Sequence, residues 1–196
     1  MGKLVVSEFI TLDGIMEDPG GGETFEHGGW SFKFDRGAEG DKFKVDELRA
    51  AEVQLLGRVT YQGFAKAWPS MTGDEFGAKM NAMPKHVVST TLTDDDADWT
   101  NSTVIRGDVA GEIARLKERV AGDILVAGSA RLVQALAGHD LVDEYRLMVF
   151  PIVLGSGKRL FGEETTPTVL RLTDTTPVGP DGVVVLTYEP ARSPRG

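Results

Sequence analysis

One stretch of the sequence combines a glycine, a guanidinium and a hydroxyl where a strand is expected to pass into a helix. Gly57 ends the run EVQLLG, and Arg58 and Thr60 lie in the first turn of the helix expected next. The N-terminus of a helix presents free N–H groups and a partial positive charge, so these side chains would suit the phosphates of a nucleotide. The alternative is that Arg58 pairs with a nearby carboxylate.

A second strand end carries small residues. In ILVAGSARL, Gly128 ends a continuously apolar run and Ser129 opens a helix. Small residues at this point let a ligand approach the backbone closely, although an ordinary tight connection between strand and helix would use them as well. The spacing is not GxGxxG, so the fingerprint of Rossmann folds is absent.

Hydroxyl side chains follow a third expected strand. In VVSTTL, the residues Ser89, Thr90 and Thr91 come directly after the apolar pair. Hydroxyls at the carboxyl end of a strand commonly face the crevice in which α/β proteins bind ligands, and a polar start to a loop is the alternative. If the three strands are parallel neighbours, their polar ends share one edge of the sheet.

The stretch VLGSGKRLF, residues 153–161, superficially resembles a phosphate-binding loop. The P-loop pattern needs a glycine five residues before Gly157, where Ile152 stands, and a hydroxyl after Lys158, where Arg159 stands. We therefore interpret the glycines as a turn after a central strand, with Leu160 and the following Phe packing back onto the core.

Other chemistries have little support in the residue types. The chain has no cysteine, which excludes disulfides and thiolate sites, and its three histidines are isolated in the sequence. Zinc motifs and the GxSxG hydrolase elbow are absent. The acidic run at residues 94–96 lacks the glycine and the distal glutamate of a calcium loop. No metal site is predicted.

Net charge and hydropathy limit the classes of binding partner. The net charge of −9 and the scattered basic residues argue against a nucleic-acid surface, whereas a local basic cluster could still bind a small anion. No apolar stretch approaches the roughly 20 residues that span a bilayer. The N-terminal run reads as a strand rather than a secretory signal. We expect a cytoplasmic protein that binds a small molecule, with no membrane or nucleic-acid partner.

The expected elements alternate between strands and helices. A long glycine-rich loop follows the first strand, and the segment GPDG predicts a tight turn in a C-terminal hairpin. This order predicts a mixed sheet with helices on both faces in one domain, residues 1–190, followed by a frayed tail at residues 191–196. Strands are expected at residues 3–10, 52–57, 84–92, 102–107, 123–128, 142–155, 168–175 and 183–189. Helices are expected at residues 39–52, 58–68, 74–82, 108–122 and 129–138.

Taken in order, several motifs resemble the dihydrofolate-reductase-like superfamily. They are SxxxTLDG, LLGRVTY, VVSTTL, VAGSARL and LVDEYRL followed by PIVLGSGKRLF. Within that superfamily the chain is most similar to the C-terminal reductase domain of the bifunctional riboflavin-biosynthesis deaminase–reductase, in a free-standing bacterial form. The resemblance runs from about residue 3 to 189. It implies a three-layer α/β/α fold with a mixed, mostly parallel sheet and a C-terminal antiparallel hairpin.

The resemblance also implies a cofactor, NADPH, and the residues that hold it. The glycine–arginine turn would hold the phosphates, the hydroxyl cluster would seat the 2′-phosphate, and the second glycine turn would lie near the pyrophosphate and nicotinamide. Ser129 replaces the second glycine of dihydrofolate reductases at that turn. The implied cofactor residues are Gly57, Arg58, Thr60, Ser89, Thr90, Thr91, Gly128, Ser129 and Arg131.

On the substrate side the resemblance is looser. Dihydrofolate reductases use a buried acid on their first helix, and Asp41 lies at a matching offset before Gly57. Asp13 is the acid placed near the substrate crevice in riboflavin-type relatives, with a local turn as its alternative role. Trp30 and Trp68 could stack on a flat heterocycle or simply pack in the core. The loop at residues 18–30 would overlie this site.

The expected activity is hydride transfer from NADPH to a C=N or C=O group of a small, flat, polar substrate such as a pyrimidine or pterin. The cofactor would carry the chemistry, so no protein nucleophile is needed. Since no zinc motif is present, we expect this chain not to be the bifunctional enzyme itself. A nucleotide-binding module without turnover, holding NADPH or flavin, is the alternative. Relatives often form dimers, so the resemblance leaves a homodimer open.

Overall fold

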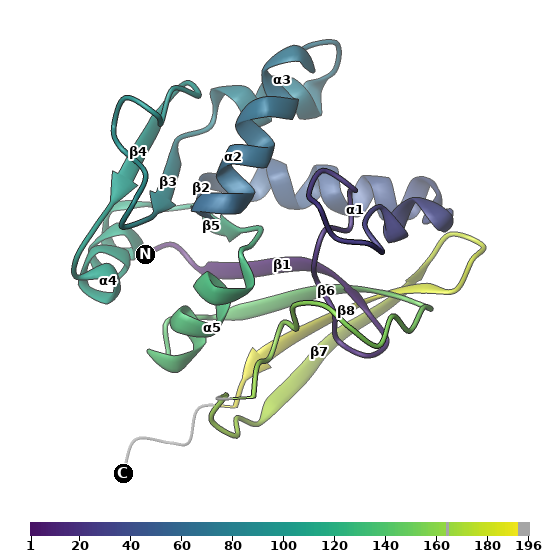
Figure 1. Ribbon diagram of the computed structural model, residues 1–196. Coiled ribbons are helices and arrows are strands. Elements are labelled where there is room, and N and C mark those ends of the chain that lie inside the picture. Colours follow the sequence, from purple (N-terminus) through teal and green to yellow (C-terminus); the bar gives the residue numbers. More distant parts are fainter. Residues whose placement is uncertain (164, 192–196) are drawn as a thin grey trace.

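The computed structural model describes residues 1–163 and 165–191 and forms a sheet flanked by helices (Figure 1). Residues 192–196 of the predicted tail lie outside this range. Strands occur in the order β4-β3-β2-β5-β1-β6-β8-β7 across the sheet. The strands are β1 (Leu4–Thr11), β2 (Ala51–Gly57), β3 (Lys85–Val88), β4 (Ser102–Ile105), β5 (Asp123–Val126), β6 (Glu144–Phe150), β7 (Leu170–Val178) and β8 (Val183–Pro190).

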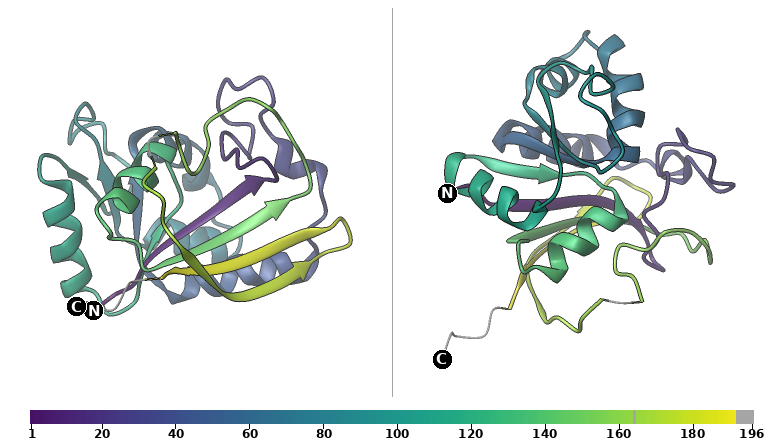
Figure 2. Two further views of the ribbon diagram at one scale, coloured as in Figure 1. Left: turned by 90° about the horizontal axis from the view of Figure 1, so that it is seen from below. Right: turned by 60° about the vertical axis from the view of Figure 1, so that its left-hand side comes forward.

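Helices cover both faces of the sheet, as Figures 1 and 2 show. One apolar cluster joins the sheet to α4 and α5, and a second joins the opposite face to α1, α2 and α3. This confirms the predicted three-layer α/β/α fold. The helices are α1 (Gly37–Ala50), α2 (Arg58–Ala67), α3 (Glu75–Ala82), α4 (Val109–Arg119) and α5 (Ala130–Gly138), with short 3₁₀ turns η1 (Trp30–Lys33) and η2 (Trp68–Ser70).

The sheet is parallel from β4 to β6 and antiparallel at its C-terminal end. Central strands are buried on both faces, and the run Leu4, Val5 and Val6 of β1 is fully buried. Strand β8 pairs antiparallel with both β6 and β7. The β7–β8 hairpin turns through the predicted GPDG segment, with Gly179 and Gly182 at positive φ. It forms one edge of the sheet (Figure 2).

The predicted strand at residues 142–155 is too long. Strand β6 ends at Phe150, because Pro151 has no N–H to continue the ladder and Ile152 folds back to donate to the Phe150 carbonyl. The turn that follows brings Leu160 into the core, as predicted. Lys158 forms an ion pair with Glu17, which joins this turn to the loop that follows β1.

Strand β1 pairs with β5 only through its amino-terminal residues. Residues Leu4–Val6 of β1 pair with Ile124–Val126 of β5, whereas the β1 ladder with β6 continues to Thr11. Beyond Val126 the chain leaves the sheet and turns at Gly128 into α5. The carboxyl half of β1 therefore has a strand neighbour on its β6 side only, and the sheet opens between β1 and the end of β5.

Within the part of the chain that the structure describes, no helix is long and apolar enough to cross a membrane.

Candidate functional site

The three polar strand ends lie at one edge of the sheet, as the sequence predicted. Strands β3, β2 and β5 are consecutive and parallel. Gly57 aligns with Val88, so Ser89 follows β3 at the same level of the sheet. On the other side, the Gly57 N–H donates to the Gly128 carbonyl oxygen at 3.0 Å. This hydrogen bond joins the two glycine turns.

Two glycines are required where these turns meet. A Cβ atom on Gly57 would lie 2.3 Å from Ser129 Oγ and 3.0 Å from Ser129 N. Gly128 has φ +94°, and a Cβ on it would lie 2.8 Å from Thr60 Oγ1. The Gly128–Ser129 peptide bond is cis. The close approach brings together four of the predicted cofactor residues, one pair from the start of α2 and one from the start of α5.

Two arginines beside these turns carry charge that the protein itself does not neutralise. Arg58 opens α2 and donates to Gln62 Oε1 at 3.0 Å, and Arg131 lies in the first turn of α5. Both side chains are exposed, and neither forms an ion pair with any described residue. The alternative role for Arg58, pairing with a carboxylate, is therefore not observed. Two helix N-termini and two free guanidinium groups fit the phosphates of a dinucleotide.

The hydroxyl cluster after β3 is partly used by its own loop. Ser89 is buried, and its Oγ accepts hydrogen bonds from the Thr91 N–H at 3.1 Å and the Leu92 N–H at 2.9 Å. The Ser89 O–H remains able to donate. Thr90 and Thr91 are exposed. The predicted β3 strand stops at Val88 rather than residue 92 because the Ser89 hydroxyl turns the chain.

Asp13 has a structural role in this fold. Its carboxylate accepts hydrogen bonds from Thr11 Oγ1 at 2.6 Å, from the Leu154 N–H at 3.3 Å and from the Gly155 N–H at 2.8 Å. Burial opposes ionisation of Asp13, but these hydrogen bonds outweigh it and hold its pKa below the ordinary value. Asp13 thus joins the TLDG turn to the VLGSG turn as a carboxylate, which does not fit a proton donor.

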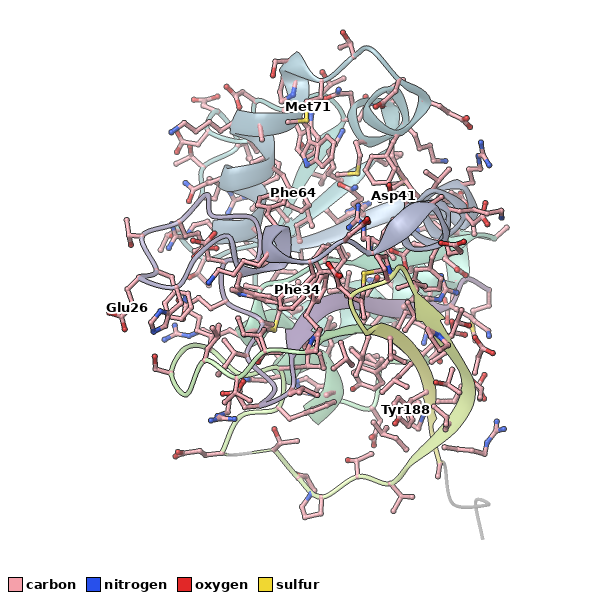
Figure 3. The ribbon with its side chains drawn as sticks, turned by 90° about the vertical axis from the view of Figure 1, so that its right-hand side faces the viewer. Glu26, Phe34, Asp41, Phe64, Met71 and Tyr188 are labelled. Carbon is pink, nitrogen blue, oxygen red and sulfur yellow. The ribbon has the colours of Figure 1, made fainter. Side chains whose placement is uncertain are left out.

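Asp41 is not the buried acid that the resemblance implied. It lies near the start of α1 (Figure 3). Its side chain is 65% exposed, and its carboxylate pairs with Arg36 Nε at 2.7 Å. The buried acid of α1 is Glu47, whose carboxylate accepts from Ser7 Oγ at 2.8 Å and pairs with Lys44. An offset from Gly57 did not reveal which face of α1 meets the sheet.

Burial excludes stacking on a ligand for Trp30, and Trp68 lies away from the glycine turns. Trp30 is fully buried, packs edge-on against Phe150 and donates to the Glu17 carbonyl oxygen at 2.8 Å. Trp68 packs between Phe64 and Phe76 just beyond α2. That helix has 10 residues, so Trp68 lies about 15 Å from its first turn. Trp30 therefore takes the alternative role, packing, whereas the half-buried Trp68 packs against two phenylalanines at the far end of α2.

Sequence reasoning missed Glu8, an acid in the middle of β1. Its exposed fraction is 8%, and its Oε1 has no hydrogen-bond partner within residues 1–163 and 165–191. Burial raises the pKa of Glu8 to about 8, while Lys44 and a backbone hydrogen bond from Gly128 lower it. The signal was present in VVSEFIT, where one acid interrupts an apolar strand. A buried carboxyl next to Gly128 belongs to the same site as the glycine turns.

The strand order and the glycine-lined edge place the chain in the class of dihydrofolate-reductase-like α/β proteins. A dihydrofolate reductase from Enterococcus faecalis has a similar structure, with a TM-score of 0.62, 14% identity and coverage of 97% of this chain and 98% of that one. The chain belongs to the RibD C-terminal domain family, whose model matches residues 2–184. This is a family of reductases.

Individual relatives agree with this assignment. Over 177 residues the chain is 30% identical to the uncharacterized protein YwjB of Bacillus subtilis (strain 168), covering 90% of this chain and 92% of YwjB. A crystal structure of a candidate riboflavin biosynthesis protein from Shewanella sp. PV-4 has a TM-score of 0.75 at 22% identity, covering 98% and 100% of the two chains.

A deaminase–reductase from Thermotoga maritima shows the same fold within a larger protein. The similarity has a TM-score of 0.62 at 16% identity and covers 97% of this chain but 57% of that one. The protein is described as a diaminohydroxyphosphoribosylaminopyrimidine deaminase/5-amino-6-(5-phosphoribosylamino)uracil reductase. At this level of identity the likeness concerns the fold alone.

Proposed function

We propose that the protein is an NADPH-dependent reductase that acts on a small, flat heterocycle such as a pyrimidine or a pterin. The observation that carries the proposal is the meeting of the two glycine turns through the Gly57–Gly128 hydrogen bond, with Arg58 and Arg131 unpaired beside it. The family supplies the cofactor, since its members use NADPH. When bound, NADPH supplies hydride to a C=N or C=O carbon of the substrate.

Each protein group has a separate part in this proposal. Arg58 and Arg131 bind the phosphates with the help of the N–H groups at the starts of α2 and α5. The Ser89–Thr91 segment binds the 2′-phosphate and so favours NADPH over NADH. Gly57 and Gly128 keep side chains away from the place where the dinucleotide crosses the two turns. The sheet opening between β1 and the end of β5 receives the reacting rings.

The substrate proposal rests on the family and on the fold, which is shared with proteins named for 5-amino-6-(5-phosphoribosylamino)uracil reduction and for dihydrofolate reduction. We propose that the substrate resembles the planar ring of one of these compounds. Reduction of this uracil and of dihydrofolate should be measured alongside simple cyclic imines, following absorbance at 340 nm. Substrate-dependent oxidation of NADPH by any of them supports the reductase. Tight NADPH binding with no NADPH oxidation in the presence of any compound of the panel would contradict the reductase proposal.

A second candidate is a module that binds NADPH or flavin without turnover. It is favoured by the positions of Trp30, Trp68 and Asp41, which leave the predicted substrate contacts unfilled. The two candidates agree on dinucleotide binding and differ only in the 340 nm assay. A yellow protein after purification would indicate flavin.

A further inference from the structure

Glu8 is an acidic residue at a position of β1 where the surrounding core is apolar. Its neighbours on the same face of β1, Val6 and Ile10, belong to the apolar core against α4 and α5. Glu8 is 8% exposed, and Oε1 is a buried acceptor without a partner in the described chain. An unsatisfied buried carboxyl costs free energy that an aliphatic residue would avoid. Such a group calls for a functional explanation.

The register of the sheet places Glu8 at the opening between β1 and β5. Val6 aligns with Val126, the last residue of β5. Glu8 and Gly128 each lie two residues further along their chains. The backbone of Gly128 is one of the groups that act on the Glu8 carboxyl. The acid is therefore adjacent to the glycine turn, on the stretch of β1 that has a strand neighbour only on its β6 side.

The surroundings keep Glu8 protonated at neutral pH. Burial and, to a smaller extent, the nearby Glu47 carboxylate raise the pKa of Glu8 to about 8 despite the opposing effects of Lys44 and Gly128. Lys44 and Glu47 both come from α1, and the β6 residue aligned with Glu8 is the apolar Leu147. Lys44 is itself bound to Glu47 and to Ser7, at 2.9 Å from the Ser7 oxygen. It is therefore not a dedicated partner for Glu8.

Two other buried acids, one on α1 and one on β6, form ion pairs. Glu47 pairs with Lys44 and accepts from Ser7, and its Oε2, which has no hydrogen bond within the described residues, lies 4.0 Å from Arg146 Nη1. Glu144 pairs with Lys3 at 3.1 Å and with Arg146 at 2.6 Å, and these partners overcome its burial and hold its pKa below the ordinary value. Glu8 has the opposite character, because it is buried like these acids but forms no ion pair with any residue described.

We propose that Glu8 is the proton donor of the site, giving its carboxyl proton to the substrate heteroatom when the adjacent carbon accepts hydride. This inference rests on the proposed reductase function. With NADPH as the two-electron reductant, the carbon forms a new C–H bond and the C=N or C=O π pair moves to the nitrogen or oxygen. That atom takes the Glu8 proton, and the Glu8 carboxylate left behind is reprotonated from water. Asp13 and Asp41, which are ionised or exposed, are not needed for this step.

The first test needs no substrate. The protein labelled with ¹³C at the glutamate carboxyl carbons should be titrated by NMR, with Glu8→Gln used to assign the signal. We expect Glu8 to titrate with a midpoint near 8. A midpoint below about 6 would overturn the proposal. Glu8 would then resemble an ordinary glutamate, whose pKa is about 4.3, and would hold no proton to donate at neutral pH.

The second test uses NADP⁺, whose oxidised ring carries a positive charge that favours a nearby carboxylate. Calorimetry at pH 7 in buffers of different ionisation enthalpy should show that wild-type protein releases a large fraction of one proton on binding NADP⁺. Glu8→Gln should lack that release and bind NADP⁺ more weakly, by up to about tenfold, because it has no carboxylate for the positive ring to favour. Equal proton release by both proteins would refute the role of Glu8. Failure of the wild type to bind NADP⁺ or NADPH at all would refute the proposed function instead.

The third test uses whichever panel compound is reduced. Proton donation by a positioned side chain typically contributes about 10²–10⁴-fold, so kcat of Glu8→Gln should fall by that factor while KM stays within about threefold. Wild-type kcat should decline above a pH of about 8, where Glu8 loses its proton. Glu112→Gln, on the exposed face of α4, is the matched control. An unchanged kcat in Glu8→Gln would contradict the proposal even if NADPH binds and is oxidised.

Discussion

The backbone N–H of Gly57 donates to the carbonyl oxygen of Gly128 at 3.0 Å, and through this bond the start of α2 meets the start of α5. Gly57 ends β2, and Gly128 lies two residues beyond β5, the parallel neighbour of β2, so both residues lie at the carboxyl edge of the sheet. Helix N-termini that meet in this way concentrate N–H donors and positive charge. The candidate dinucleotide site follows from that single contact and from the unpaired arginines on either side.

Gly57→Ala should disturb this contact directly. The new Cβ would lie 2.3 Å from Ser129 Oγ and 3.0 Å from the Ser129 backbone nitrogen, which cannot move without shifting the turn. We expect a loss of about 1–3 kcal/mol in the free energy of unfolding, together with weaker NADPH binding. Urea denaturation and calorimetry measure the two effects.

Gly63→Ala provides the control within the same helix. Gly63 lies inside α2, and beyond the backbone of that helix and its two chain neighbours its added Cβ would have no described atom within 4 Å. Alanine in an open helix interior should raise stability by up to about 1 kcal/mol and leave NADPH binding unchanged. If the two variants behaved alike, close packing of the glycine turns would not be the reason for glycine at residue 57.

Much of this arrangement could be predicted from the sequence, because it depends on local patterns. Glycine and small polar residues after apolar runs mark strand ends, and alternation of strands with helices indicates a parallel sheet that places those ends together. The C-terminal hairpin followed from GPDG in the same way. Motif order then identified the fold, which the comparisons confirm.

The missed features depend on contacts between distant segments. The face of α1 that meets the sheet selects Glu47 rather than Asp41, and packing against Phe150 decides that Trp30 is core. Asp13 could be recognised as structural only once Leu154 and Gly155 were beside it. The role of Glu8 depends on its position beside Gly128, whereas the sequence shows only an acid inside an apolar strand.

Asp13→Asn tests the structural role of the TLDG turn. The change replaces the carboxylate, which accepts three hydrogen bonds, with a neutral amide. The free energy of unfolding at pH 7 should therefore fall by about 1–3 kcal/mol. Since the folded-state pKa is lowered, the carboxylate contributes stability above its ordinary pKa and loses it as pH falls through the folded value. The difference between wild type and variant should therefore shrink in acid, as measured by urea denaturation.

Asp95→Asn, in the exposed acidic run, is the matched control and should leave stability unchanged at either pH. A variant Asp13→Asn that kept full stability but lost turnover would restore Asp13 as a catalytic acid.

Glu8→Gln should change the dependence of stability on pH. The wild-type carboxyl has a pKa of about 8 when folded, against the ordinary value of 4.5 in the unfolded chain. Between these values the folded protein holds a proton that the unfolded chain has lost. Stability contributed by Glu8 is therefore complete at low pH and falls by about 1.4 kcal/mol per pH unit across the window. In urea denaturation, the free energy of unfolding of the variant should increase relative to that of wild type as the pH rises from 5 to 8.

Glu112→Gln, which changes an exposed acid, should follow the wild-type curve. Parallel curves for wild type and Glu8→Gln across the window would show that Glu8 is already ionised in the folded protein.

The most direct measurement of the central claim is calorimetric titration of NADPH into wild type, Arg58→Ala and Arg171→Ala. Arg171 pairs with Glu189 on the β7–β8 hairpin and serves as the control. Hydrogen bonds to charged groups contribute about 1.5–3 kcal/mol, so Arg58→Ala should bind NADPH about 10- to 150-fold more weakly, while Arg171→Ala matches wild type. No heat from wild type at millimolar NADPH, or equal affinity in all three proteins, would contradict a dinucleotide site at this edge of the sheet.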